Sequence, residues 1–215
     1  MEIDLLDTLP QPKRDTKARA AVKTEEDRAI ARRYGQEFFD GDRKYGYGGY
    51  RYDGRWLSVA KRMAQHYQLP PNAKILDVGC AKGFLMFDFQ QALPASTVRG
   101  LDVSTYARDH AHGGMQEFID IGSAESLPYP DNAFDLAVSI NSLHNLPDAK
   151  FRQALKELSR VSKHQFISVD AWHNEAERLR LMDWLHTAAS YHHVDDWTQL
   201  FHDCAYQGDY WWFTP

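Results

Sequence analysis

The chain has 215 residues, of which 43% are hydrophobic, and its formal net charge is -5. That length is enough for one well-buried core and short for two domains. The acidic balance argues against a nucleic-acid groove or an anionic membrane as the main partner. No apolar run approaches the roughly 18 residues that a membrane span requires.

The N-terminal sequence and the cysteines bear on the cellular compartment. Residues 1–15, MEIDLLDTLPQPKRD, contain early acids and no apolar segment, which is not the pattern of a secretory signal. The two cysteines, Cys80 and Cys204, belong to no metal-type cluster. We therefore expect reduced thiols in a cytoplasmic protein.

Two helices and an unusual aromatic stretch are expected before the first strand. Residues 1–20, with Pro10 and Pro12, predict a loosely held arm. Residues 24–40 carry apolar side chains spaced by four after a capping threonine, which predicts one amphipathic helix. The stretch 44–56, KYGYGGYRYDGRW, combines tyrosine with glycine. A second helix is expected over 55–69, where two prolines end it.

From residue 73 onward, short apolar runs alternate with helical patterns. Strands are expected over 73–79, 97–103, 117–122, 134–140, 165–172 and 206–213, and helices over 84–93, 106–111, 148–162, 175–190 and 195–204. This alternation predicts an α/β fold with a single doubly wound, mostly parallel sheet. Ligands of such sheets bind beyond the carboxyl ends of the strands, so functional residues should directly follow strands.

The first strand leads into a glycine turn, DVGCAKGF. Gly79 and Gly83 bracket the turn, where a ligand can approach the backbone and the free N–H groups of the next helix. Asp77 precedes the turn and can accept a hydrogen bond from an ammonium group. A close-packed turn without a ligand is the competing interpretation. Asp102, at the end of the second strand, weighs against it, because a carboxylate there can accept from two ribose hydroxyls.

The spacing within the turn favours one nucleoside cofactor. Gly79-x-Ala81-x-Gly83 is one residue shorter than the dinucleotide fingerprint, which makes room for a pyrophosphate. A ligand with an amine near the turn is favoured instead, and S-adenosylmethionine offers ribose hydroxyls to Asp102 and an amino group to Asp77. A short nicotinamide-dependent oxidoreductase is the rival that the compressed spacing disfavours.

Four landmarks in order resemble the class I S-adenosylmethionine-dependent methyltransferases. ILDVGCAKGFL is similar to the first motif of that family, GLDVS to the second, and GSAESLPYPDNAFDLAVSINSLHNLPD to the third and fourth. The resemblance covers residues 55–172. It implies S-adenosylmethionine as cofactor and a Rossmann-like methyltransferase domain over 55–215, preceded by an arm, a helix and a Tyr/Gly lid over 1–54. We expect one strand beyond the fifth, where the family's sheet finishes with a hairpin.

The resemblance also implies roles for individual residues. Asp77, Gly79 and Gly83 would line the methionine part of the cofactor, Asp102 with Val103 would hold the ribose, Ser123 and Ala124 would border the adenine, and Asn141 would lie beside the methionine end. Two positions depart from the family pattern. Ala81 replaces the middle glycine, which fits if its φ stays negative, and Ser123 replaces an acid at the adenine edge. These departures keep a third alternative open, a cofactor-binding module without catalysis.

Candidate catalytic groups follow the fourth and fifth strands. Alignment of the reacting groups accelerates methyl transfer, and a general base helps if the acceptor must lose a proton. We rank His144 first and Asp170 second as the base, and Tyr47 in the lid is a third catalytic candidate. Capping or core roles are the competing interpretations of the first two. Because His192 and His193 have no third ligand nearby, we expect no metal site.

The Tyr/Gly stretch suggests the character of the acceptor. In this family such N-terminal segments fold over the methyl end of the cofactor, and glycines would let the lid open and close. Tyr45, Tyr50, Arg51, Arg55 and, after the fifth strand, His173 are the expected substrate-binding residues. Arginine forks suit a carboxylate or phosphate. An aromatic cluster that ties the arm to the body is the competing interpretation of this stretch.

These residues together predict a methyltransferase of a small molecule. We expect O-methylation of an anionic or sugar-like metabolite in a biosynthetic pathway, with N-methylation of a small amine as the rival. Neither nucleic acid nor membrane is expected as a partner. Adjacent Trp211 and Trp212 on the last strand should point to opposite faces, which leaves a homodimer contact open.

Overall fold

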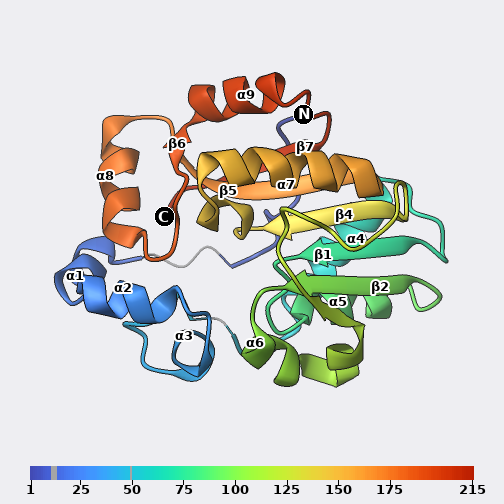
Figure 1. Cartoon of the computed structure of the whole chain (residues 1–215), viewed down its shortest axis with the longest axis horizontal. Helices are drawn as coiled ribbons and strands as arrows, with labels where there is room; N and C mark the ends of the chain where they lie inside the picture. The colour runs from blue at the N-terminus through green and yellow to red at the C-terminus, as the bar shows by residue number, and fades with distance from the viewer. Residues whose placement is uncertain (11–13, 49) are drawn as a thin grey trace.

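Figure 1 shows the fold as a computed structural model that describes residues 1–10, 14–48 and 50–215. The helices that precede the sheet in this part of the chain are α1 (Thr16–Ala21), α2 (Glu25–Ala31), α3 (Gln36–Asp40) and α4 (Trp56–His66). The strands are β1 (Lys74–Val78), β2 (Thr97–Asp102), β3 (Ile119–Ile121), β4 (Phe134–Ile140), β5 (Ser162–Trp172), β6 (His192–His193) and β7 (Asp209–Phe213). The remaining helices are α5 (Phe84–Ala92), α6 (Thr105–Asp109), α7 (Asp148–Val161), α8 (Glu175–Trp184) and α9 (Val194–Asp203), with 3-10 turns η1 (His112–Phe118) and η2 (Leu143–Asn145).

The strands form one sheet in the order β3-β2-β1-β4-β5, and both β6 and β7 pair with β5. Every strand pair within the described part of the chain is parallel. The chain moves outward from β1 to β3 and then returns to the other side of β1 with β4, so strand order reverses between β1 and β4. The predicted doubly wound sheet is confirmed, and its reversal point is where such folds bind ligands.

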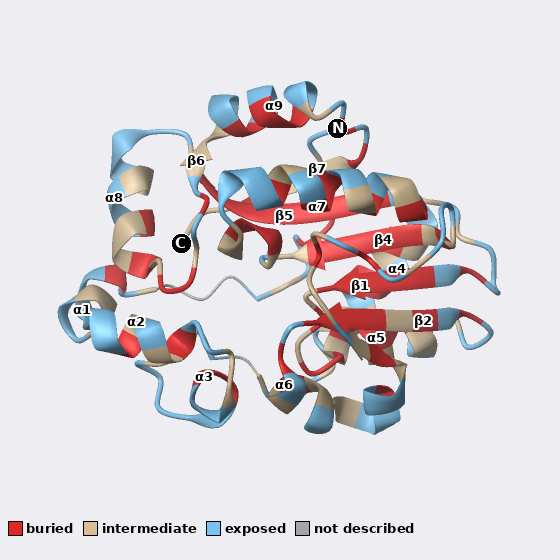
Figure 2. Ribbon diagram, viewed as in Figure 1, coloured by how far each residue is buried: buried red, intermediate tan, exposed pale blue. Residues whose placement is uncertain are grey.

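Helices cover both faces of the sheet, and each face has its own core. On one face, Phe151 and Leu155 of α7 pack with Trp197 of α9. On the other face, Met63 of α4 packs with Phe89 of α5. Figure 2 shows the buried residues concentrated on the strands and on the helix surfaces that face them. Because β1, β4 and β5 are covered on both sides, most of their residues are buried, whichever face of the sheet they point to.

The N-terminal arm is held more firmly than the sequence predicts. The backbone N–H of Ile3 donates to the carbonyl of Tyr210 in β7 at 3.0 Å. Leu5 and Leu6 are buried in the core cluster that contains α4. The prediction of a loosely held arm is therefore wrong for residues 1–10, because backbone pairing and apolar burial fix them. Pro12 lies outside the described residues.

The predicted helix over 24–40 is divided into two. α2 ends at Ala31, Tyr34 adopts a left-handed φ of 49°, and α3 begins after Gly35. The Tyr34 carbonyl accepts a hydrogen bond from the hydroxyl of Ser104 at 2.5 Å. The residues spaced by four therefore belong to a bent segment and not to one helix. The rings of Tyr34 and Phe38 still contact each other, with centroids 5.2 Å apart.

Helices α1, α2, α3 and α8 lie beyond the carboxyl ends of the strands, toward which the arrowheads of β1, β2 and β4 point in Figure 1. α1 packs on α8, so the N-terminal helices and the segment after β5 form one wall. The predicted helix over 175–190 is shorter than expected, because α8 ends at Trp184 and the chain then passes along this wall. The space between wall and sheet holds the candidate site.

Candidate active site

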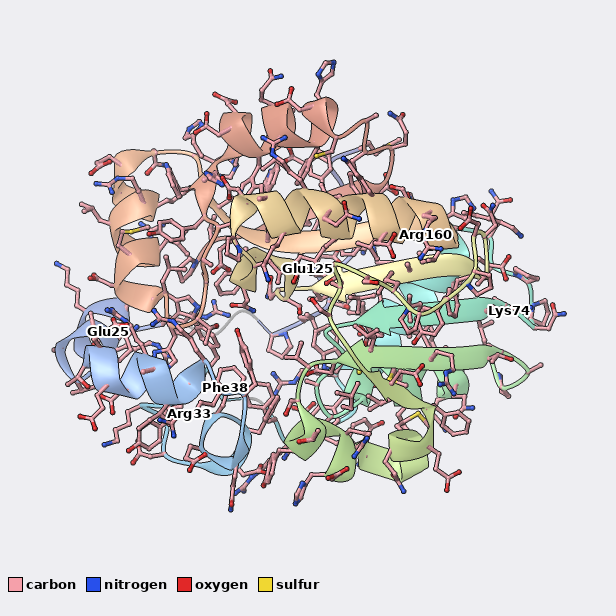
Figure 3. All side chains as sticks on the ribbon, viewed as in Figure 1. Glu25, Arg33, Phe38, Lys74, Glu125 and Arg160 are labelled. Carbon is pink, nitrogen blue, oxygen red and sulfur yellow. The ribbon has the colours of Figure 1, made fainter. Side chains whose placement is uncertain are left out.

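A cavity of about 1530 Å³ lies between the strand ends and the helical wall. Figure 3 shows the labelled side chain of Phe38, one of its lining residues, between the N-terminal helices and the strand ends. Pockets that enclose one drug-sized ligand usually have roughly 300–1,000 Å³. The cavity therefore has room for a cofactor and a second small molecule.

Most of the residues that the sequence singles out line this cavity. They are Tyr47, Tyr50, Arg55, Asp77, Gly79, Ala81, Asp102, Val103, Ser123, Ala124, Asn141, His144, Asp170 and His173. Tyr45, Arg51 and Gly83 are not among its lining residues. Arg51 is exposed on the surface, and Gly83 serves the turn itself as the residue before α5.

The glycine turn has the tight geometry that its sequence predicts, with one correction. Gly79 has a φ of 79°, and a Cβ there would collide with the hydroxyl of Ser142. Ala81 has a φ of 49°, so the condition under which alanine fits this position, a negative φ, is not met. A left-handed conformation costs a non-glycine residue about 1–2 kcal/mol. The hydrogen bond from the Ala81 N–H to Asp102 Oδ2, at 2.8 Å, helps to hold this conformation.

Asp77 has a buried carboxyl group at the edge of the cavity, without a hydrogen-bond donor among the described residues. Burial raises the pKa of Asp77 to about 8, and the nearby charge of Asp102 adds to the shift. Burial penalises an isolated charge unless a partner compensates for it. An ammonium group at this position would supply that partner, so Asp77 fits the amino group of S-adenosylmethionine.

Asp102 is held by the backbone while it faces the same cavity. Its Oδ2 accepts from the Ala81 N–H and its Oδ1 from the Ser104 N–H, both at 2.8 Å. Each oxygen retains a lone pair, which fits two ribose hydroxyls. Burial raises the pKa of Asp102. The next residue, Val103, is 53% exposed beside it and offers an apolar surface.

The residues after β3 and β4 complete this half of the cavity. Ser123 donates a hydrogen bond to Glu125 Oε1 at 3.0 Å, so its hydroxyl already has a carboxylate partner. Asn141, with a φ of 50°, accepts from the hydroxyl of Ser168 through its Oδ1 at 2.7 Å. The amide nitrogen of Asn141 has no acceptor among the described residues. This arrangement leaves an amide donor at the cavity.

His144 and Asp170 form a buried pair after β4 and β5. The Nδ1 of His144 accepts from the backbone N–H of Asp170 at 3.3 Å, and its Nε2 lies 3.5 Å from Asp170 Oδ2. A ring nitrogen that accepts a hydrogen bond carries no proton, so we assign the proton of the neutral ring to Nε2. Burial lowers the pKa of His144 and raises that of Asp170. A neutral histidine therefore faces the carboxyl group.

Tyr47 joins the lid to the segment after α8. Its hydroxyl accepts from the backbone N–H groups of His186, at 2.8 Å, and Thr187, at 3.2 Å. Burial raises the pKa of Tyr47, and the charge of Asp170 raises it further. The hydroxyl therefore keeps its proton near neutral pH. Tyr47 forms a fixed part of the cavity wall, close enough to Asp170 for the charge of that residue to affect the pKa of its hydroxyl.

The other predicted substrate-binding residues have partners outside the cavity. Arg55 donates from Nε to Asp53 Oδ1 at 2.9 Å. The Nδ1 of His173 lies 2.9 Å from Glu177 Oε2, within the same surface segment. Arg51 is exposed. These positions do not present three converging donors to one substrate.

Sequence reasoning missed several cations of the cavity. Lys82 of the glycine turn is buried and pairs with both oxygens of Asp40 in α3 at 2.6 Å, which links the N-terminal helices to the turn. Arg14, Arg19 and Arg43 also line the cavity. The position of Lys82 within the glycine turn DVGCAKGF could have indicated from the sequence that it lies at the site. Arg14 and Arg19 lie in the segment that reads as a loose arm, and only the fold brings them to the site.

The described residues lack two further kinds of feature. They contain no group of three or more His, Cys, Asp or Glu side chains arranged to hold a metal ion. They also contain no helix with the length and apolarity needed to cross a membrane.

Comparison with known proteins identifies the domain type. Residues 75–165 match a family described as a methyltransferase domain. The demethylmenaquinone methyltransferase of Lysinibacillus sphaericus is 34% identical over 104 residues, which are 46% of this chain and 44% of that protein. The chain thus aligns with less than half of the length of this relative.

Solved structures share the fold at low sequence identity. The YcgJ protein of Bacillus subtilis superimposes with a TM-score of 0.55 at 20% identity, covering 71% of this chain and 68% of that one. The [4+2]-cyclase SpnF superimposes with a TM-score of 0.54 at 24% identity, covering 70% of this chain and 56% of that one. These similarities show the fold, and the chemistry has to be argued from the site.

Proposed function

Because this chain belongs to the class I S-adenosylmethionine-dependent methyltransferases, we propose that it transfers a methyl group from this cofactor to an oxygen atom of a small polar acceptor. One observation carries the proposal. A single cavity joins Asp77 and Asp102, after β1 and β2, to the pair of His144 and Asp170, after β4 and β5. The carboxyl groups that would bind the cofactor and the candidate base thus face the same cavity.

The first half of the cavity would hold the cofactor. Asp77 would bind its ammonium group, Asp102 would accept from its ribose hydroxyls, and the turn around Gly79 would let it approach the backbone. When bound, S-adenosylmethionine supplies an electrophilic methyl group on a sulfonium ion. The chain then has to hold the acceptor oxygen in line with that methyl group, which can contribute about 7–11 kcal/mol to lowering the barrier.

Asp170 is the better candidate for the general base, which reverses the order that the sequence suggested. Both ring nitrogens of His144 are directed at Asp170, one at its backbone and one at its carboxyl group. His144 would therefore position Asp170, with its Nε2–H directed at the Oδ2 atom 3.5 Å away. Burial raises the pKa of Asp170 from that of an exposed carboxyl toward the range in which a base works well near neutral pH.

The alternatives are less well supported by the cavity. Four arginine side chains line it, and their charge would oppose the binding of a protonated amine, which disfavours N-methylation. The structural similarity to a [4+2]-cyclase shows that this fold also carries other chemistry, so a function without methyl transfer remains the main rival. Both cysteines are free thiols, which supports a cytoplasmic location.

Two measurements test the proposal. Calorimetry with S-adenosylmethionine, S-adenosylhomocysteine and NADH should show binding of the first two compounds only. Purified protein incubated with S-adenosylmethionine and a panel of small hydroxy acids and sugar phosphates should then release S-adenosylhomocysteine with at least one acceptor. Tight binding of NADH alone would refute the cofactor assignment. Cofactor binding with a different transformation of the acceptor would refute methyl transfer.

A further inference from the structure

The cavity contains an arginine cluster that the cofactor half does not use. The cluster consists of Arg14, just before α1, Arg19 within α1, and Arg43, after α3. None of the three has a carboxylate within 4.0 Å among the described residues, and the four undescribed residues include no acid. The neighbouring acids Asp15 and Asp42 accept from backbone N–H groups instead.

Aromatic rings hold two of these guanidinium groups in place. The Arg14 group lies 4.9 Å from the ring centroid of Phe213 and 5.4 Å from that of Trp184. The Arg19 group lies 4.6 Å from the Trp184 ring and 5.1 Å from the Tyr47 ring. Stacking on rings fixes a guanidinium plane and leaves its N–H groups free to bind an anion in a bidentate manner.

The hydrogen bonding and electrostatics of the cluster are incomplete. Arg19 donates from Nη2 to the carbonyl of Gly46 at 3.0 Å, while its buried Nε has no acceptor among the described residues. Burial lowers the pKa of each of the three arginines, and the charge of Arg43 lowers that of Arg14 and Arg19 further. A bound anion would reduce the repulsion among the three guanidinium groups and would supply the acceptor that Arg19 Nε lacks.

Arg14 lies on the β7 side of the cavity, away from the cofactor half. Phe213, under Arg14, pairs in register with Asp170 of β5. Asp77 lies on β1, and the order β1-β4-β5-β7 puts three strand spacings, about 14 Å, between β1 and β7. Tyr47 connects the cluster to the candidate base, because its ring lies under Arg19 and the charge of Asp170 raises the pKa of its hydroxyl.

We propose that Arg14, Arg19 and Arg43 form the subsite for a carboxylate or phosphate group of the acceptor, placed so that the reacting hydroxyl reaches Asp170 past the Tyr47 ring. The inference rests on the proposed function and specifies its acceptor as a small hydroxyl compound with an anionic end. The carboxylate of the cofactor's methionine part is the other anion that these groups could bind, and the test separates the two sources.

The test uses the full chain saturated with S-adenosylhomocysteine, so that the cofactor half is occupied. Inorganic phosphate and acetate are titrated separately at constant ionic strength, with calorimetry and the NMR signals of the arginine Nε–H groups as readouts. We expect one saturable site for at least one of the two anions. Arg14→Gln and Arg19→Gln should weaken it about tenfold or more, because each removes a charged hydrogen-bonding group. Arg178→Gln, on the exposed part of α8 and paired with Glu175, should leave it unchanged.

Cofactor affinity decides between the two sources of the anion. S-adenosylhomocysteine should bind wild type, Arg14→Gln and Arg19→Gln with equal affinity. A parallel tenfold loss in these variants would assign the cluster to the cofactor and overturn the proposal. No saturable anion site in wild type, or equal anion binding in all variants, would also overturn it. If a glutamine variant does not fold, Arg→Lys at the same position replaces it. Lysine lacks the planar guanidinium group that binds an anion through two hydrogen bonds, so anion affinity should still fall.

Failure of this test is distinct from failure of the proposed function. Binding of S-adenosylhomocysteine without anion binding would leave methyl transfer intact and remove the anionic acceptor. An absence of cofactor binding would reject the proposed function, whatever the anion does.

Discussion

The Nδ1 of His144 accepts a hydrogen bond from the backbone N–H of Asp170 at 3.3 Å, while its Nε2 lies 3.5 Å from Asp170 Oδ2. One imidazole ring thus contacts both the main chain and the side chain of the same residue. Because Nδ1 accepts, the proton of the neutral ring lies on Nε2 and points at the carboxyl group. This tautomer supports the proposal that Asp170, and not His144, accepts the proton of the acceptor hydroxyl.

Asp170→Asn tests this assignment most directly. The amide cannot take a proton, so kcat for methyl transfer should fall by about 10²–10⁴-fold, while the dissociation constant of S-adenosylmethionine stays within a factor of about two. Asp196→Asn, an exposed position of α9, is the matched control. An unchanged kcat would remove Asp170 from the chemistry.

His144→Gln tests the positioning role through the pH profile. The positive end of the Nε2–H group, 3.5 Å from Asp170 Oδ2, favours the ionised form of Asp170, and the electrostatic interaction with His144 lowers the pKa of that carboxyl group. Without the ring, the pKa of Asp170 should rise, and the acid limb of kcat against pH should move to higher pH. A fall in kcat with an unmoved acid limb would mean that His144 has a packing role only.

Asp102→Asn should weaken the cofactor. The variant loses the charge that ribose hydroxyls would bind and can no longer accept from both Ala81 and Ser104. We expect the dissociation constant of S-adenosylmethionine to rise about 10- to 100-fold by calorimetry. Asp109→Asn, exposed at the end of α6, should change nothing. Equal affinities for wild type and Asp102→Asn would exclude Asp102 from the cofactor site.

We expect Asp77 to release a proton when the cofactor binds. Because burial raises the pKa of Asp77 to about 8, most of this carboxyl group is protonated at pH 7 in the free protein. A bound ammonium stabilises the carboxylate, so its pKa falls and a proton leaves. Calorimetry in buffers of different ionisation enthalpy should detect the released proton, and affinity should rise between pH 6 and pH 8. Asp77→Asn should abolish both effects; persistence of proton release in that variant would assign it elsewhere.

Leu5→Ala tests whether the N-terminal segment contributes to stability. Leu5 is 1% exposed and belongs to the core cluster around α4 and β1. Removing a buried leucine side chain should lower the free energy of unfolding by about 2–5 kcal/mol, measured by urea denaturation. Leu179→Ala, at a position that is 53% exposed, should change it by less than about 0.5 kcal/mol. Similar values for both variants would support the loose arm after all.

Much of the fold follows from local sequence patterns. The strand over 134–140 and the helix that begins at Asp148 lie where the pattern predicts them. Local patterns succeed here because a strand covered on both sides is largely apolar and a helix against it needs one apolar stripe. The same argument places Asp77 and Asp102 at strand ends, and the structure brings both to one cavity.

Local patterns failed where distant segments decide the backbone. Tyr34 interrupts the predicted N-terminal helix, and its carbonyl accepts from Ser104, seventy positions along the chain. Ala81 takes a positive φ in a turn that also bonds to Asp102. Neither neighbour is visible in the local sequence, so propensity alone predicted the more common conformation.

By itself, the sequence determined the parallel α/β architecture and the glycine turn, since both depend on residue order and backbone preference over a few neighbouring positions. Only the tertiary structure decided which nitrogen of His144 faces Asp170 and that Arg14 and Arg19, far from β5 in the chain, line the same cavity. Those relations depend on distances between segments that pack together through burial, and burial is a property of the whole fold.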